Sequence, residues 1–217
     1  LLYLDTLDSS YHLIPQSPAM PSYEIAIIFS GLEHALVNSA YNARVDECKA
    51  AAYALKAYAG IPYDKLAATV LRDVEESVFE QHREHLPLNW QKRAVHYYSE
   101  LNRVREGVAA WEQGDLNRFG ALVFNSGDSS INNYESGSPE LKKLHEIARR
   151  AEGIYGGRFS GAGFKGCYMA LIDPAFKEPL VRQFTEEYLQ AFPDLKSRFS
   201  IHFCHSADGV DLEGQHL

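Results

Sequence analysis

The sequence lacks the features that mark a membrane protein or a nucleic-acid-binding protein. No apolar run in its 217 residues approaches the roughly 18 residues that a membrane-spanning helix needs. Its 21 basic residues are outnumbered by 29 acidic ones, and the net charge of −8 argues against nucleic acid or an anionic membrane as a partner. The apolar start, residues 1–4, is followed by Asp5 and has no basic residue before it, so it is not a signal peptide.

Cysteine is scarce, and so are patterns that would hold a metal ion. Cys48, Cys167 and Cys204 form an odd and sparse set, which indicates buried thiols in a reducing compartment, and we expect the cytosol. Residues 202–205 (His-Phe-Cys-His) have neither the spacing of a zinc finger nor that of a helical two-histidine site. The two histidines within residues 82–85 lack a third ligand. The sequence therefore predicts no metal site.

Hydrophobic periodicity predicts a mixture of strands and helices. Apolar or alternating runs predict strands at residues 24–30, 166–173 and 199–204, and one or two strands within residues 1–14. Helical spacing predicts helices at residues 39–59, 63–70, 75–85, 89–113, 116–126, 138–151 and 179–192. The segments 15–21 and 126–137 are predicted loops, and the tail 207–217 is expected to fray. No internal repeat or long linker divides the chain, so the predicted class is α+β.

Glycine, by contrast, is concentrated in one place, with five glycines in residues 155–166. Glycine weakens regular structure, so such a segment is expected where bare backbone must approach another group. Ser160, Gly161, Ala162 and Gly163 can present successive backbone N–H groups to an anion or a sugar oxygen. A tight turn between two strands is the alternative. The segment is neither a Walker A loop nor a dinucleotide fingerprint, because no Gly-Lys-Ser/Thr follows it and a strand comes next.

The same segment carries a resemblance to a known family. Residues 158–167 read Arg-Phe-Ser-Gly-Ala-Gly-Phe-Lys-Gly-Cys, and they resemble the C-terminal glycine-rich motif of the galactokinase branch of the GHMP family of small-molecule kinases. Three further segments resemble the same family in order. They are residues 41–48 (Tyr-Asn-Ala-Arg-Val-Asp-Glu-Cys), 93–96 (Arg-Ala-Val-His) and 134–141 (Tyr-Glu-Ser-Gly-Ser-Pro-Glu-Leu). Because the similarity extends over about residues 1–210, it is far more specific than any single motif.

The resemblance implies a fold and a division of the chain. It implies a GHMP-kinase-like C-terminal domain of the α+β class, with a helical layer packed on a small, largely antiparallel sheet. Residues 1–22 would be the end of the N-terminal domain's sheet and its connecting loop, and residues 23–217 would be the C-terminal domain. Since the chain has no initiator Met and begins within a predicted strand, we expect a fragment whose N-terminal part is missing.

The resemblance also implies an activity. A monomeric, ATP-dependent sugar-1-kinase would transfer the γ-phosphoryl group of ATP, bound with Mg²⁺, to the anomeric hydroxyl of a sugar. The family's phosphate-binding loop, catalytic aspartate and partner arginine lie in its N-terminal half, and none is found here. The aspartate would lie just upstream of Leu1. No catalytic residue is therefore assigned within this chain, and we expect the fragment alone to be inactive.

Two departures from the galactokinase pattern bear on the substrate. Lys165 and Ala162 replace glycines of the family's glycine run, and residues 29–32 read Phe-Ser-Gly-Leu where galactokinases have an Asn-Ser/Thr-Asn type of sequence. Both departures resemble the galacturonokinase subgroup known from plants, and a cation at Lys165 would suit a substrate carboxylate. Galacturonate is therefore the predicted substrate. The alternative substrates are galactose and a non-sugar alcohol. The alternative function is that of a non-catalytic sugar-binding relative, and the alternative role of Lys165 is that of a solvated lysine.

The resemblance assigns roles to particular residues. The residues expected to contact the sugar are Tyr41, Ser30, Gly31, Gly161, Ala162, Gly163 and Lys165. The residues expected to lie near the nucleotide phosphates are Ser160, Gly161 and Gly163. From the residues alone Tyr41 would be a packing tyrosine, whereas the resemblance brings its hydroxyl to the sugar, which a tyrosine can contact while its ring packs on apolar surface.

Overall fold

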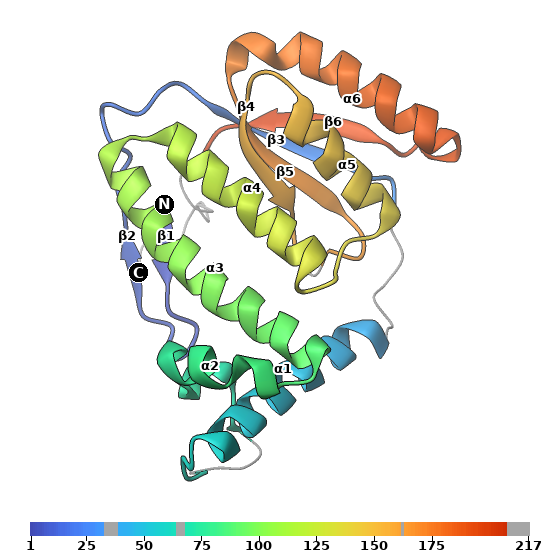
Figure 1. Cartoon of the computed structure of the whole chain (residues 1–217). Helices are drawn as coiled ribbons and strands as arrows, with labels where there is room; N and C mark the ends of the chain where they lie inside the picture. The colour runs from blue at the N-terminus through green and yellow to red at the C-terminus, as the bar shows by residue number, and fades with distance from the viewer. Residues whose placement is uncertain (33–38, 64–67, 162, 208–217) are drawn as a thin grey trace, which may run out of the picture.

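The computed structural model describes residues 1–32, 39–63, 68–161 and 163–207, and it has the predicted α+β class (Figure 1). The strands are β1 (Leu2–Leu4), β2 (Tyr11–Leu13), β3 (Glu24–Phe29), β4 (Ile154–Phe159), β5 (Cys167–Ile172) and β6 (Ser200–Cys204). The α-helices are α1 (Ser39–Tyr58), α2 (Glu76–His82), α3 (Leu88–Gln113), α4 (Leu116–Asn132), α5 (Pro139–Arg150) and α6 (Lys177–Ala191). Short 3₁₀ turns are η2 (Leu71–Asp73), η3 (Arg83–His85), η4 (Pro174–Phe176) and η5 (Pro193–Leu195).

Four strands form one antiparallel sheet in the order β4-β5-β3-β6, which confirms the predicted antiparallel arrangement. The central strand β3 comes early in the chain and pairs with β5 on one side and with β6 on the other. Strands β1 and β2 form a separate antiparallel hairpin. None of the described helices is long and apolar enough to cross a membrane.

The two faces of the four-stranded sheet differ in how they are covered. On one face, side chains of β3 and β5 such as Ile28, Tyr168 and Ala170 are buried against α5 and α6, and the two helices lie on this side of the sheet in Figure 1. The strand registers place the alternate residues on the other face. That face, which we call the open face, carries Ile25, Ile27, Phe29, Cys167, Met169 and Leu171.

A second core joins the helices at the opposite end of the molecule. Leu55 of α1, Phe79 of α2 and Tyr98 of α3 are buried together, and the rings of Phe79 and Tyr98 stack with centroids 4.9 Å apart. Helix α3 ends at Gly114, whose φ of 75° lets the chain turn directly into α4. Asp115 caps α4 by accepting a hydrogen bond from the Arg118 amide.

The predicted loop at residues 126–137 is wrong for its first half, because α4 continues to Asn132. Serine and glycine are weak helix formers, since their side chains and backbone find other partners readily. Here the hydrogen bonds of buried side chains stabilise the helix instead. Ser126 and Ser130 are buried, Ser130 donates a hydrogen bond to the Ser126 carbonyl at 2.9 Å, and Arg158 donates to both hydroxyls.

Other differences from the predicted elements are local. Strand β4 contains Gly156 and Gly157 and was not predicted, since glycine is unfavourable in strands. The helix predicted at residues 63–70 falls partly on residues 64–67, outside the described ranges, and residues 69–70 are not helical. Most of the tail predicted to fray, residues 208–217, is likewise outside the described ranges.

Candidate functional site

The glycine-rich segment forms the loop between β4 and β5, residues 160–166. Gly161, Gly163 and Gly166 have φ of 68°, 78° and 95°, a left-handed conformation that residues with side chains rarely adopt. A Cβ on Gly161 or Gly166 would meet open space, whereas a Cβ on Gly163 would lie 2.2 Å from the Phe159 ring. Packing therefore requires the glycine at 163, while Gly161 leaves an exposed stretch of bare backbone.

Backbone hydrogen bonds fix the loop at both ends and determine which N–H groups a ligand can reach. The Ser160 amide donates to the Cys167 carbonyl at 2.9 Å, and the Ser138 amide donates to the Gly163 carbonyl at 2.9 Å. The Ser160 amide is thus engaged in the sheet, so the expected run of free N–H groups does not begin there. The Gly161 amide donates to no other described residue, and with the Ser160 hydroxyl it is the polar group that the loop can offer.

Ser30 and Gly31 follow β3 and lie behind this loop. Ser30 is completely buried, its amide donates to the Gly166 carbonyl at 3.0 Å, and its carbonyl accepts from the Tyr188 hydroxyl at 2.7 Å. Gly31 has φ of 86°, and a Cβ there would lie 3.2 Å from the Arg198 Cβ. The structure therefore shows these two residues supporting the loop from within the protein, and their contact with a sugar stays a prediction.

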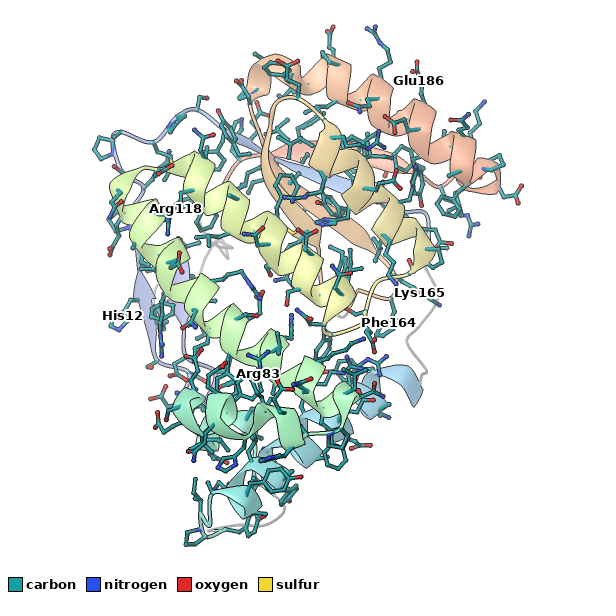
Figure 2. The ribbon with its side chains drawn as sticks, viewed as in Figure 1. His12, Arg83, Arg118, Phe164, Lys165 and Glu186 are labelled. Carbon is teal, nitrogen blue, oxygen red and sulfur yellow. The ribbon has the colours of Figure 1, made fainter. Side chains whose placement is uncertain are left out.

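The remaining predicted residues differ in how they lie relative to the loop. Lys165 is half-buried, and in the view of Figure 2 it lies with Phe164 between the four-stranded sheet and α1. Tyr41 belongs to the first turn of α1, is 46% exposed, and shares no hydrogen bond with the described loop residues. Ala162 lies outside the described residues. The structure thus gathers at one end of the sheet Ser30, Gly31, Ser160, Gly161, Gly163 and Lys165.

A polar cluster just before the loop was not predicted. Arg158 donates to the Ser126 hydroxyl, lies 3.4 Å from the Ser130 hydroxyl, and has its guanidinium 3.6 Å from a Glu100 carboxylate oxygen. Ser126 also donates to Glu100 at 2.9 Å. These contacts hold β4 to α3 and α4 immediately before the glycine loop. The sequence carried a signal for Arg158, which lies in the glycine-rich motif, but none for serines that were predicted to be in a loop.

A second cluster joins three segments that resemble the kinase family. Arg93 is completely buried, and its guanidinium lies 2.6 Å from Glu47 and 2.8 Å from Glu135. Lys92 contacts the second oxygen of Glu135 at 2.6 Å, and Arg44 contacts Glu47 at 3.1 Å. The hydrogen bonds from Lys92 and Arg93 lower the pKa of Glu135 to about 2. The short motifs noted in the sequence thus meet in space in a charge cluster that holds α1 to α3.

Beside this cluster, a half-buried histidine and a half-buried tyrosine lie together. The rings of His96 and Tyr134 have centroids 4.9 Å apart, and His96 Nδ1 lies 2.9 Å from the Ser129 hydroxyl. Burial lowers the pKa of His96 to about 4, so its imidazole is neutral at neutral pH. Burial also raises the pKa of Tyr134 to about 12, with further contributions from the neighbouring Cys48 and Tyr41.

A cavity of about 350 Å³ adjoins the glycine loop. It lies between α4, which contributes Phe119 and Val123, and the open face of the sheet. Ser160 and Gly161 also line it, so the cavity extends to the exposed part of the loop. Its lining is otherwise apolar except for Arg158.

The ligands of a divalent metal ion are not found in this part of the protein. The described ranges contain no group of three or more His, Cys, Asp and Glu residues that could hold a metal ion. The exposed backbone at Gly161 does fit an anion or a sugar oxygen, because no side chain stands in front of it. The arrangement can therefore bind and orient a polar ligand, but it shows no site for a metal.

Comparison with known proteins finds a match to one family model and similarity to two kinds of kinase. Residues 104–190 match the family model described as GHMP kinases C terminal. The chain is 40% identical over 218 residues to a galacturonokinase from Arabidopsis thaliana, a match that covers 97% of this chain and 50% of that protein. It is 35% identical over 211 residues to a galactokinase from Roseiflexus sp. (strain RS-1), covering 96% of this chain and 50% of that protein.

A solved structure has the same fold. The crystal structure of Lactococcus lactis galactokinase complexed with galactose superposes with a TM-score of 0.79 at 26% sequence identity. The match covers 93% of this chain and 49% of that chain. The chain thus spans about half the length of the relatives that it matches.

Proposed function

From the premise that this chain contains a GHMP kinase C-terminal domain, we propose that it is the C-terminal half of an ATP-dependent sugar-1-kinase whose substrate is galacturonate. The observation that carries the proposal is the 40% identity to a galacturonokinase along 97% of the chain. The departures at Lys165 and at residues 29–32, which resemble the galacturonokinase subgroup, support the same substrate.

The geometry of the loop supports a sugar-binding role. Gly161 exposes backbone with no side chain in front of it, and the half-buried Lys165 lies four residues further along the same loop. A lysine ammonium forms a charge-assisted hydrogen bond with a carboxylate, so Lys165 would distinguish a uronate from a neutral sugar. Tyr41 and the backbone at 161–163 would contact the sugar hydroxyls.

The nucleotide would supply the phosphoryl group, which passes to the anomeric hydroxyl with the help of Mg²⁺. In this proposal Ser160, Gly161 and Gly163 form the wall of the site near the phosphates. The residue that accepts the hydroxyl proton would lie upstream of Leu1, because residues 1–5 resemble the strand that follows the family's catalytic aspartate. This half alone would therefore be inactive.

The hairpin β1–β2 supports the proposed boundary between the two halves. Leu2, Leu4, Tyr11 and Leu13 share one face of the hairpin and are all exposed. Two strands alone are marginally stable, and an apolar face on them is expected to be covered by further protein. We therefore assign residues 1–22 to the sheet and connecting loop of the N-terminal domain, and residues 23–217 to the C-terminal domain.

Galactose is the second candidate substrate. It is favoured by the 35% identity to the Roseiflexus galactokinase and by the fold shared with a galactokinase whose structure contains galactose. For the full-length protein, we propose a monomer that works in the cytosol, in line with the three cysteines, which form no disulfide.

The test is ATP turnover by the full-length protein with galacturonate and with galactose, beside the 217-residue chain. We expect turnover on galacturonate by the full-length protein alone. Turnover on galactose alone would retain the kinase and overturn the uronate assignment. Sugar binding without turnover on either substrate would identify a non-catalytic relative instead.

A further inference from the structure

The short segment between α4 and α5, residues 133–138, links two parts of the candidate site, and we call it the connecting segment. At one end the Ser138 amide donates to the Gly163 carbonyl at 2.9 Å, which ties the segment to the glycine loop. At the other end Glu135 contacts α1, the helix that carries Tyr41. Since Tyr41 shares no hydrogen bond with the described loop residues, the connecting segment is the hydrogen-bonded link between that helix and the loop.

Glu135 is held from several sides. One of its carboxylate oxygens lies 2.6 Å from the Lys92 ammonium, and the other lies 2.8 Å from the Arg93 guanidinium and 3.9 Å from that of Arg44. Its carbonyl also accepts a hydrogen bond from Arg44 at 3.5 Å. Arg93 and Arg44 both contact Glu47 as well, at 2.6 Å and 3.1 Å. The connecting segment is therefore tied through one carboxylate to both α1 and α3.

The backbone at Glu135 has an unfavourable conformation that these ion pairs hold in place. Among the described residues other than glycine, only Ser9 and Glu135 have a positive φ, and that of Glu135 is 54°. A residue with a Cβ rarely adopts this conformation, and it persists where surrounding contacts require it. The next residue, Ser136, is buried, and its amide and hydroxyl both donate to the Ser130 carbonyl at 3.0 Å. The turn at Glu135 thus sets the direction in which the chain proceeds to Ser138.

We infer that Glu135 is a positioning residue for the sugar. Its ion pairs hold the connecting segment between α1 and the glycine loop, and so they fix the distance between Tyr41 and the loop backbone. This inference rests on the proposed function, in which Tyr41 and the loop contact the same sugar. Two groups that bind one small ligand must be held at a defined spacing, because hydrogen bonds weaken steeply when their geometry is disturbed.

Two variants and a matched control test the inference in the proposed full-length protein. Glu135→Gln keeps the shape of the side chain and removes its charge. Lys92→Met removes one of the two closest cations, and since the Lys92 side chain is 33% exposed, we expect this variant to fold. Glu146→Gln is the control, because Glu146 is an exposed glutamate on α5 that also lies 3.1 Å from each of two cations, Lys143 and Arg150.

The first measurement is KM and kcat for the sugar that the wild type phosphorylates. We expect KM for the sugar to rise about tenfold in Glu135→Gln, about threefold in Lys92→Met and less than about twofold in Glu146→Gln. A merely structural role predicts a different result. Partial unfolding reduces the amount of active enzyme, which lowers the apparent kcat and leaves KM unchanged. An unchanged KM in Glu135→Gln would therefore overturn the inference, whatever its kcat.

The second measurement is hydrogen exchange of the Ser138 amide, which reports directly on its bond to the Gly163 carbonyl. We expect this amide to exchange at least about fivefold faster in Glu135→Gln than in the wild type, while the amides of α6 keep their rates, because local opening is independent of global unfolding. Equal rates at Ser138 would contradict the link to the loop. Faster exchange in α6 as well would show an effect on overall stability, and that too would overturn the inference.

Turnover by the wild type tests the proposed function separately. Turnover combined with an unchanged KM in Glu135→Gln would remove only the positioning role. No turnover on either sugar would remove the proposed function, whereas faster exchange confined to Ser138 in the same protein would still support the link between Glu135 and the loop.

Discussion

Gly120 of α4 lies directly against Gly156 of β4, so that a helix backbone and a strand backbone touch without a side chain between them. A Cβ on Gly156 would be 2.1 Å from the Gly120 carbonyl oxygen, and a Cβ on Gly120 would be 2.0 Å from the Tyr155 carbonyl oxygen. Close contacts of this kind explain why a glycine-containing strand can form at β4. They also set the distance between α4 and the sheet, and hence the width of the cavity beside the loop.

Replacing Gly120 is therefore expected to be costly. In Gly120→Ala the methyl group would meet backbone atoms, which cannot rotate away, and overpacking of this kind costs about 3 kcal/mol of stability or more. The measurement is the free energy of unfolding by urea. Gly107→Ala in α3 is the matched control, because its methyl group would meet only the Phe119 ring at 3.6 Å. We expect the control to gain about 0.5–1 kcal/mol from helix propensity, and equal losses at both positions would contradict the role of the contact.

Removal of the buried guanidinium of Arg93 should destabilise the helical part. Arg93→Met leaves Glu47 and Glu135 without their central partner, and we expect a loss of about 2–4 kcal/mol, since breaking a buried ion pair is costly. Arg118→Met is the control, because Arg118 is exposed and pairs with the exposed Glu106. Such a surface pair contributes roughly 0–1 kcal/mol. Similar denaturation midpoints for the two variants would show that the cluster adds little to stability.

Stability should fall as the pH is lowered from about 6.5 to about 4. His96 has its pKa lowered from 6.5 to about 4 by burial, so in this range the unfolded chain binds a proton that the folded chain does not. Burial also lowers the pKa of His145, which acts in the same direction. The stability from these neutral histidines is complete above pH 6.5 and is lost as the pH falls through the folded pKa. Glu135 has its pKa lowered from 4.5 to about 2, so the stability it contributes is complete above pH 4.5 and is lost only as the pH falls from there towards 2.

His96→Asn tests this assignment through the slope of unfolding free energy against pH. A difference of one bound proton between the unfolded and the folded chain gives a slope of about 1.4 kcal/mol per pH unit in the unfolding free energy. We expect this slope to be smaller in the variant by about 1 kcal/mol per pH unit between pH 6 and pH 4.5. His12→Asn, at an exposed position on β2, serves as the control and should keep the wild-type slope. An unchanged slope in His96→Asn would contradict the prediction.

In the proposed full-length kinase, Lys165 should set the preference for a uronate. We expect Lys165→Met to lower kcat/KM for galacturonate roughly tenfold to a hundredfold, the value of a charge-assisted hydrogen bond, and to change kcat/KM for galactose by less than about twofold. Lys143→Met removes a lysine that is paired with Glu146 on α5, and it should change kcat/KM for neither substrate. If the selectivity of Lys165→Met equals that of the wild type, Lys165 is a solvated lysine without a role in recognition.

The local signals in the sequence were reliable where short-range chemistry decides the structure. Ser138 caps α5 by accepting a hydrogen bond from the Leu141 amide, and Pro139 occupies the first turn. The three strands predicted after residue 22 form at β3, β5 and β6, because β-branched and apolar residues suit a buried sheet. The family resemblance is confirmed by the match of residues 104–190 to the GHMP kinase C-terminal model.

What the sequence did not reveal depends on contacts between distant segments. The helical state of residues 126–132 requires Arg158, which lies about 30 residues later, and no local propensity indicates it. Burial of Ser30 behind the loop depends likewise on Tyr188, 158 residues away. Motif reasoning placed Ser30 and Gly161 together as equal candidates for sugar contact, whereas only Gly161 is exposed.

The place of β3 in the middle of the sheet also has a consequence for how the chain acquires its structure. β3 ends at Phe29, but its two partners begin at Cys167 and Ser200, so the sheet cannot close until almost the whole chain has left the ribosome. Closing a loop of this length costs entropy before any strand pairing compensates for it, and long-range pairings of this kind slow folding. Helices α1 to α4 lie between these partners in sequence and can assemble first. During synthesis, the apolar edges of β3 would then remain exposed and open to aggregation until β5 and β6 arrive.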